Sequence, residues 1–333
     1  MPKNFEGIFA PLTTPFEKES AAPEHLTENI QKYNSTKLSG YVILGSTGES
    51  VYLSDDESVR LVSAAMKAAA SDKTIIVGTA RESTVLTINF TNRIAELGSD
   101  AALIRTPSYF KSRLDDDALK HHFLTIADSS KIPIIVYNIP VHTGITLSPH
   151  VVIELSRHPN IIGIKDSSGN LAFLGEVKPY LHEKFHFLLG AASILLPGLI
   201  MGADGGIITV SSVAPNLSTE LYELYKNNKI EQALKTQFSL IPLNKALIQT
   251  FGVPAVKYAL DLLGFYGGPP RSPLHPLSEA GKREVREILK TLGLIDQSED
   301  RRWKSRRQKS EDGKPEDRRQ KIGENQRRRE AKG

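Results

Sequence analysis

The chain has 333 residues, of which 40% are hydrophobic and 24% are charged, a composition typical of a globular protein with a sizeable core. It has no cysteine, which excludes a disulfide framework, a thiolate metal site and a cysteine nucleophile. The sequence begins with neither an apolar signal core nor a transit peptide, and its apolar runs are too short to span a bilayer. We therefore expect a soluble, cytoplasmic protein with no membrane partner.

The basic charge is concentrated near the C-terminal end. The chain carries 42 Lys and Arg against 38 Asp and Glu, a net charge of +4. Residues 297–333 hold 14 of the basic and 8 of the acidic residues, so the rest of the chain has 28 against 30, a net −2. Few apolar residues occur there, which predicts a disordered basic tail over 296–333. Such a tail could contact nucleic acid or an anionic surface, or act as a localisation signal, but mixed-sign tails are usually just solvated.

Short β-rich apolar runs alternate with longer helix-like segments, as in a parallel sheet with crossover helices. The sequence Ser54-Asp55-Asp56-Glu57 is typical of a capping box and opens a helix over 59–70, and Ser148-Pro149 opens another over 151–157. The eight expected strands cover residues 7–13, 41–45, 74–79, 101–106, 132–137, 161–165, 185–189 and 206–210.

Eight strand–helix units in about 215 residues match a (β/α)8 TIM barrel, which we place at residues 1–217. A doubly wound sheet is the alternative, and the lack of a G-x-G-x-x-G turn after the first strand disfavours it. Only helical patterns follow the eighth strand, which predicts a C-terminal helical extension of the same domain over 218–295. Its helices are expected at residues 218–225, 230–251, 254–263 and 278–292.

Lys165 carries the strongest chemical signal in the sequence. It closes the apolar run 161–164 and is followed at once by the polar turn 166–169. An ammonium group at the end of a buried strand is costly to desolvate, which favours the neutral amine and makes it a nucleophile towards carbonyls. Lys165 is therefore a candidate for forming a Schiff base, although a lysine standing alone at a strand end more often extends to solvent.

In a barrel, catalytic groups lie at the C-terminal ends of strands and in the loops that follow. Tyr137 ends the fifth strand, beside the strand of Lys165, so its phenol could reach the amine and shuttle protons. A half-buried aromatic would be the simpler interpretation if the lysine were absent. Tyr109 follows the fourth strand and could equally be a rim or interface aromatic.

The second strand ends in the turn Gly45-Ser46-Thr47-Gly48-Glu49. The hydroxyl groups of Ser46 and Thr47 and the backbone amides of the turn could bind a carboxylate, although such a turn is often plain turn chemistry. Glu49 would brace the loop or cap the helix that follows.

Four motifs now stand in order on successive strands. They are Gly45-Ser46-Thr47-Gly48-Glu49, Thr106-Pro107-Ser108-Tyr109, Tyr137-Asn138-Ile139-Pro140 and Ile162-Gly163-Ile164-Lys165-Asp166-Ser167. Together they resemble the dihydrodipicolinate synthase and N-acetylneuraminate lyase family of pyruvate-dependent class I aldolases, over residues 5–295. Residues 251–254 and 266–274 are most similar to the 4-hydroxy-2-oxoglutarate aldolase branch.

The resemblance implies that Lys165 forms an iminium with the C2 carbonyl of pyruvate. Ser46 and Thr47 would hold the pyruvate carboxylate. Tyr137 would be the general acid and base, relaying protons through Thr47 to Tyr109, which in this family is usually lent by a neighbouring subunit. The chemistry then needs no metal and no cofactor, since the covalent lysine imine is itself the electron sink. We expect a homo-oligomer, a dimer or tetramer, that acts on a small 2-oxo acid.

The resemblance also points to the residues around the substrate. Gly190 and Ile208 match positions that line the pyruvate pocket of the family. Dihydrodipicolinate synthases usually carry an arginine two residues after the proline of the Tyr-Asn-x-Pro motif, where this chain has His142. A histidine cannot give the same bidentate, permanently charged contact, which counts against efficient dihydrodipicolinate synthesis. Ser108 also replaces the first of two tyrosines common in the family.

The sequence therefore predicts a carbon–carbon lyase that cleaves or forms a 4-hydroxy-2-oxo acid, with the cleavage of 4-hydroxy-2-oxoglutarate to pyruvate and glyoxylate as the first candidate. The enzymatic alternatives are a dihydrodipicolinate synthase, a 2-keto-3-deoxy sugar-acid aldolase and a sialic-acid lyase. A nucleic-acid-binding protein with an inactive barrel is the alternative from another class, and the joint presence of Lys165, Tyr137, Thr47 and Tyr109 disfavours it.

Overall fold

The computed structural model describes residues 3–296, so the expectations for the basic tail fall outside the described residues. One compact unit covers residues 1–289, and a second covers 290–333, of which only 290–296 are described. No helix within the described part of the chain is both long and apolar enough to cross a membrane.

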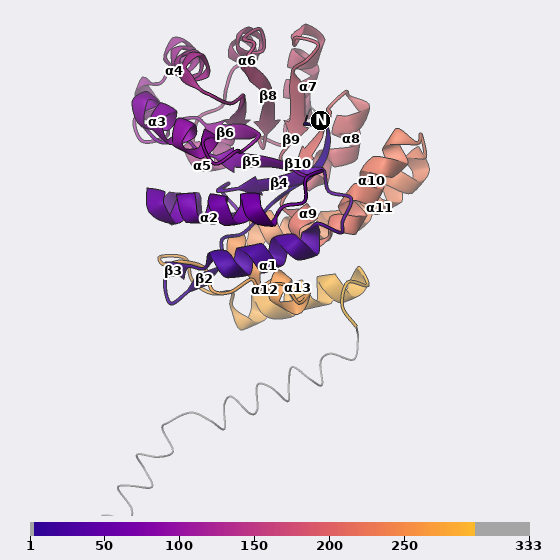
Figure 1. Cartoon of the computed structure of the whole chain (residues 1–333). Helices are drawn as coiled ribbons and strands as arrows, with labels where there is room; N and C mark the ends of the chain where they lie inside the picture. The colour runs from indigo at the N-terminus through magenta and orange to yellow at the C-terminus, as the bar shows by residue number, and fades with distance from the viewer. Residues whose placement is uncertain (1–2, 297–333) are drawn as a thin grey trace, which may run out of the picture. The chain divides into compact units, whose positions relative to one another are not determined.

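Within residues 3–289, eight parallel strands close into a barrel in the spatial order β1-β10-β9-β8-β7-β6-β5-β4 (Figure 1). Their bounds are β1 Gly7–Pro11, β4 Gly40–Ile43, β5 Thr74–Gly78, β6 Ala101–Arg105, β7 Ile134–Asn138, β8 Ile161–Asp166, β9 His186–Leu189 and β10 Gly205–Ile207. This closure confirms the predicted TIM barrel over the doubly wound alternative.

Helices connect the strands and lie outside them (Figure 1). The helical segments up to β10 are α1 Pro23–Tyr33, η1 Ser50–Tyr52, α2 Asp55–Ala68, α3 Thr84–Ala95, η2 Lys111–Arg113, α4 Asp116–Ser129, α5 Pro140–Thr143, α6 Pro149–Leu155, α7 Leu171–Val177, η3 Lys178–Tyr180, η4 Ala192–Ile194 and α8 Leu195–Ile200. The capping box of α2 is confirmed, because the Ser54 hydroxyl accepts from the Glu57 amide while the Glu57 carboxylate accepts from the Ser54 amide. Ser148 likewise caps α6.

Apolar side chains fill the barrel interior. One buried cluster takes a residue from nearly every strand: Phe9, Val42, Ile76, Ala101, Leu103, Ile135, Tyr137, Leu188 and Ile207. Because successive side chains on a strand point to opposite faces, these alternate positions define the inward face of each strand. Tyr137 is the member of this cluster that brings a polar group to the C-terminal end of the barrel.

The helical extension differs from the prediction over residues 230–251, and its short first helix, α9, was not predicted. Its segments are α9 Val210–Val213, α10 Pro215–Lys226, α11 Ile230–Asn244, η5 Lys245–Thr250, α12 Val253–Leu262 and α13 Glu279–Thr291. The single helix expected over 230–251 is wrong, since α11 ends at Asn244 and a π-helix follows. Pro242 lies inside α11, and a proline supplies no amide for the regular helical hydrogen bond. The division of the domain at residue 217 stays a prediction.

A small hairpin was missed by the sequence patterns. Strands β2 (Phe16–Glu17) and β3 (Ser20–Ala21) pair antiparallel across Lys18 and Glu19, which both have a positive φ. Two residues per strand are too few to give a periodic signal.

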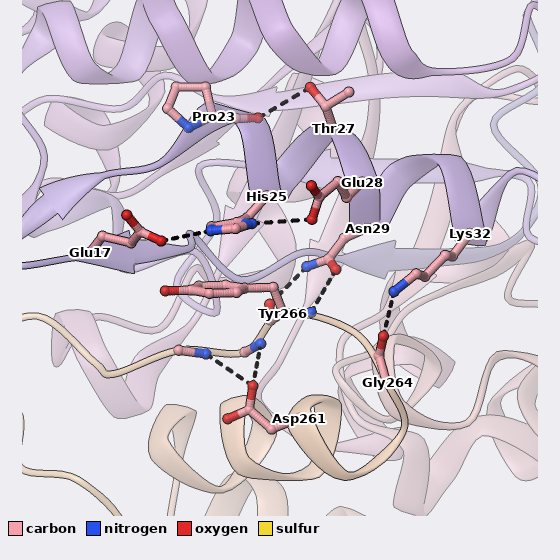
Figure 2. Close-up of polar contacts among 12 residues, drawn as sticks. Glu17, Pro23, His25, Thr27, Glu28, Asn29, Lys32, Asp261, Gly264 and Tyr266 are labelled. Carbon is pink, nitrogen blue, oxygen red and sulfur yellow. Dashed lines mark hydrogen bonds and ion pairs between the residues drawn. The ribbon is translucent and has the colours of Figure 1, made fainter.

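Polar contacts hold the loop after α12 against α1, as Figure 2 shows. The Asn29 side chain donates to the carbonyl of Tyr266 and accepts from its amide, each at 2.8 Å. The His25 ring stacks on the Tyr266 ring with centroids 3.7 Å apart. Burial alone would lower the pKa of His25, but its contacts with Glu17 and Glu28 outweigh that effect and raise it. The loop therefore has a fixed place beside the hairpin and α1.

Candidate active site

Lys165 and Tyr137 lie opposite each other on neighbouring strands. The register of β7 and β8 pairs the two residues directly, at the C-terminal ends of both strands. Each is only 4% exposed, and the Lys165 Nζ atom lies 4.1 Å from the centre of the Tyr137 ring. The structure thus brings together the two residues on which the predicted chemistry depends, with a buried amine beside a phenol.

The next residue on each of these strands makes a second contact. The Asn138 side-chain amide donates to the Asp166 carboxylate at 2.6 Å, and the Ser168 hydroxyl donates to the same carboxylate at 2.7 Å. Burial raises the pKa of Asp166 despite these hydrogen bonds. The Ser167 amide donates to the Asn138 carbonyl, so the ends of β7 and β8 are fixed to each other directly after the lysine. The sequence analysis named Asn138 and Asp166 within its motifs but gave neither residue a role.

The turn after β4 holds Ser46 and Thr47. The Gly48 amide closes the turn on the Gly45 carbonyl at 3.0 Å. Thr47 is buried and Ser46 is partly buried. The Thr47 hydroxyl lies 3.1 Å from the Thr209 hydroxyl, so the turn after β4 contacts the segment after β10. No local sequence signal pointed to Thr209.

Glu49 braces the turn, which was one of its two expected roles. Its carboxylate forms an ion pair with Lys257 of α12 at 2.7 Å, and both side chains are 1% exposed. The same carboxylate accepts from the Arg271 amide at 2.9 Å. Burial lowers the pKa of Lys257, and the charge on Glu49 opposes this shift. Glu49 precedes η1 but makes no side-chain cap there, so it links the turn to the helical extension instead.

Gly190 and Ile208 follow β9 and β10. The Gly190 amide donates to the Asp166 carbonyl at 2.6 Å. A Cβ atom at Gly190 would lie 1.9 Å from the Ser167 hydroxyl oxygen, so this position has no room for a side chain. Ile208 is fully buried. Both residues directly follow a strand, and their contact with pyruvate stays a prediction.

Tyr109 does not contact this group. Its side chain is 80% exposed on the loop between β6 and η2, where its ring meets Phe110 edge to face. Among residues 3–296, no hydrogen bond joins Thr47 to Tyr109 or to Tyr137, so the proton relay stays a prediction. An exposed tyrosine is available to a neighbouring subunit, which is the arrangement that the resemblance implies.

His142 lies on α5, directly after β7. Part of its side chain is exposed, yet desolvation of the ring and the charge on Lys165 both lower its pKa. His142 is therefore within electrostatic reach of the lysine, and it is predominantly neutral at pH 7.

A possible metal-ligand group lies elsewhere. Glu17, Glu24 and His25 place one ligand atom each within 4.8 Å of one another. Both carboxylates are exposed, and His25 already pairs with Glu17 and with Glu28. Nothing in this geometry connects the group with the chemistry of Lys165.

The chain is similar to known proteins over most of its length. Residues 4–292 match the dihydrodipicolinate synthetase family. Two proteins named 4-hydroxy-tetrahydrodipicolinate synthase are each 36% identical to this chain. The protein from Methanothrix thermoacetophila matches over 86% of this chain and 96% of its own length, and the one from Archaeoglobus fulgidus over 87% and 99%.

Solved structures agree with these relatives. A dihydrodipicolinate synthase from Aquifex aeolicus has a TM-score of 0.84 and 30% identity, covering 88% of this chain and all of its own. A monomeric dihydrodipicolinate synthase variant has the same TM-score and 29% identity, covering 88% and 99%. The family uses a lysine Schiff base with pyruvate, acts on small molecules and commonly forms oligomers. The chain therefore belongs to the dihydrodipicolinate synthetase family of pyruvate-dependent class I aldolases and is an enzyme of the carbon–carbon lyase class.

Proposed function

We propose that this enzyme is a 4-hydroxy-tetrahydrodipicolinate synthase, which joins pyruvate to aspartate semialdehyde. The observation that carries the chemistry is the buried pair of Lys165 and Tyr137 at the ends of β7 and β8. The choice of product is supported by relatives of that name that are 36% identical over nearly their whole length. These relatives favour the synthase over the 4-hydroxy-2-oxoglutarate aldolase that the sequence analysis placed first.

In this proposal the Lys165 amine attacks the C2 carbonyl of pyruvate, and loss of water gives an iminium. The iminium draws electrons from C3, so a C3 proton can leave and an enamine forms. The enamine carbon attacks the aldehyde, and the amino group that came from aspartate semialdehyde then displaces the Lys165 amine from the imine carbon, which closes the ring and frees the lysine. Tyr137 offers a phenol beside Lys165 for the proton transfers, and the turn that holds Ser46 and Thr47 receives the pyruvate carboxylate.

A second candidate reverses the same chemistry. Cleavage of 4-hydroxy-2-oxoglutarate also passes through an imine on Lys165 and releases pyruvate and glyoxylate. The observation in its favour is His142, which stands where dihydrodipicolinate synthases usually carry arginine. His142 cannot supply the bidentate, permanently charged contact of that arginine, which counts against the synthase.

Two measurements test the proposal. Borohydride reduction in the presence of pyruvate should attach a reduced pyruvate group to the peptide that contains Lys165, and Lys165→Arg should lose this adduct while it remains folded by circular dichroism. Absence of an adduct on folded wild-type protein would overturn the Schiff-base mechanism. Steady-state kinetics then separate the two candidates. A higher kcat/KM for 4-hydroxy-2-oxoglutarate than for aspartate semialdehyde would reject the synthase in favour of the aldolase.

A further inference from the structure

Arg105 stands in the same row of the barrel as the two residues of the proposed chemistry. The register pairs Arg105 with Tyr137 across β6 and β7, and Tyr137 with Lys165 across β7 and β8. Leu103, two residues earlier, belongs to the interior cluster, so the alternation of side chains turns Arg105 towards the interior as well. Adjacent strands are about 4.8 Å apart, which puts the backbones of Arg105 and Lys165 roughly 10 Å apart.

The guanidinium group of Arg105 is held in place but has unused donors. Its side chain is 21% exposed. One nitrogen donates to the Thr106 carbonyl at 2.9 Å, and the other terminal nitrogen pairs with Glu82 at 2.9 Å. Arginine carries five N–H donors, so within the described residues these two contacts leave three available. A fixed fork with free donors is suited to binding a carboxylate.

Glu82 neutralises this charge only in part, because four donors share its carboxylate. The amides of Ser108 and Tyr109 and the Ser108 hydroxyl donate to it, in addition to Arg105. Burial opposes ionisation of Glu82, but these donors outweigh it and lower its pKa to about 2. Glu82 therefore stays ionised at neutral pH and fixes the loop that holds Tyr109, and the guanidinium keeps part of its attraction for a second anion.

We propose that Arg105 binds the carboxylate of the aldehyde partner and so makes the enzyme specific for aldehydes that carry an acid group. This inference rests on the proposed function, because it takes the pyruvate imine to form on Lys165. An aldehyde that approaches the enamine from the row of Tyr137 would direct its carboxylate along the same row towards Arg105. His142 gives no permanent charge at neutral pH, whereas arginine is charged at every working pH.

The test compares acceptors with and without a carboxylate. The Arg105→Met variant would be assayed with pyruvate and either aspartate semialdehyde, glyoxylate or the uncharged glycolaldehyde. Loss of a charged hydrogen bond should raise KM for the two acids by roughly 10- to 100-fold. The kcat/KM for glycolaldehyde and the yield of borohydride-trapped pyruvate should stay unchanged. A matched control is Arg81→Met, because Arg81 follows β5 but pairs with Asp55 and covers the Phe90 ring.

The Glu82→Gln variant distinguishes a role of Arg105 in aldehyde specificity from a role in positioning the Tyr109 loop. It removes the ion pair but keeps the guanidinium, so it should not raise the KM for acidic aldehydes relative to that for glycolaldehyde. An equal loss with both kinds of aldehyde in Arg105→Met would overturn the proposal and assign Arg105 a role only through Glu82 and the Tyr109 loop. If borohydride traps no pyruvate on the wild-type enzyme, the proposed function itself is refuted.

Discussion

The Lys165 Nζ atom lies 4.1 Å from the centre of the Tyr137 ring, on the strand next to it. A cation over an aromatic ring is stabilised by about 0.5–2 kcal/mol, more when the pair is desolvated, as it is here. An iminium formed on Lys165 would be such a cation, so the ring can stabilise the covalent intermediate. The phenol of the same residue can then serve proton transfer, so one side chain supports two separate functions.

The Tyr137→Phe variant tests whether the ring and the hydroxyl group have these separate functions. The variant keeps the ring but loses the hydroxyl group. We expect the pyruvate imine still to be trapped by borohydride, while kcat falls roughly 100-fold or more, since general acid–base catalysis contributes about 10²–10⁴-fold. Single-turnover trapping and steady-state kinetics measure the two effects. Unchanged kcat would show that the phenol of Tyr137 is not the proton carrier.

Gly190→Ala tests the close approach of β9 to the end of β8. The new methyl group would meet the Ser167 hydroxyl oxygen at 1.9 Å and the Asp166 carbonyl at 2.9 Å. Overpacking of this kind costs about 1–3 kcal/mol, and here it would also displace the residue next to Lys165. We expect a lower midpoint of urea unfolding together with lower activity.

The control for this variant is Gly175→Ala on α7, where the nearest heavy atom to an added methyl is the flexible end of Met201 at 3.2 Å. That change should leave activity unaltered. Equal activity of the Gly190 and Gly175 variants would contradict the steric argument.

The barrel and the pairing of Tyr137 with Lys165 could be predicted because both depend on local sequence patterns. Apolar runs of strand length mark β7 and β8, and in a barrel the ends of consecutive strands are neighbours, which places Tyr137 beside Lys165. Arg105 carries the same signal, a cation at the end of an apolar strand, and the motif comparison overlooked it. Thr209 and Lys257 gave no such signal, because their partners Thr47 and Glu49 are distant in sequence and only tertiary packing brings them together.

Stability at low pH should depend on Glu57. Its hydrogen bonds to Arg271 lower its pKa from 4.5 to about 2, against the opposing effect of burial. Because this pKa is lower in the folded chain, the contribution is fully present above about pH 5 and is lost as the pH falls from 4.5 towards 2. After allowance for screening by solvent, Glu57→Gln should cost about 1–2 kcal/mol at pH 7.

Urea unfolding of wild type and Glu57→Gln at several pH values measures this dependence. The difference between the two proteins should shrink towards zero near pH 2. Asp56→Asn is the matched control on the same helix turn, since the Asp56 side chain is 84% exposed, and it should not alter the pH profile. A difference between Glu57→Gln and wild type that is independent of pH would contradict the assignment.

The buried pair of Glu49 and Lys257 predicts an asymmetric effect of removing either partner. Lys257→Met leaves the Glu49 carboxylate buried without its cation, which costs about 3–5 kcal/mol. Glu49→Gln should cost less, because burial lowers the pKa of Lys257 and the stranded lysine can release its proton more readily. The double variant should then lose less stability than the sum of the two single variants, since neither charge remains.

Denaturant unfolding of the wild type, the two single variants and the double variant measures this coupling. The KM for pyruvate shows whether the ion pair also affects the turn of Ser46 and Thr47. Lys131→Met is the control, because its pair with Glu96 is exposed on both sides and its loss should leave stability unchanged. Additive losses in the Glu49 and Lys257 variants would mean that the two charges do not depend on each other. A raised KM for pyruvate in Glu49→Gln, with the imine still trapped on Lys165, would show that the helical extension stabilises the substrate turn through this ion pair.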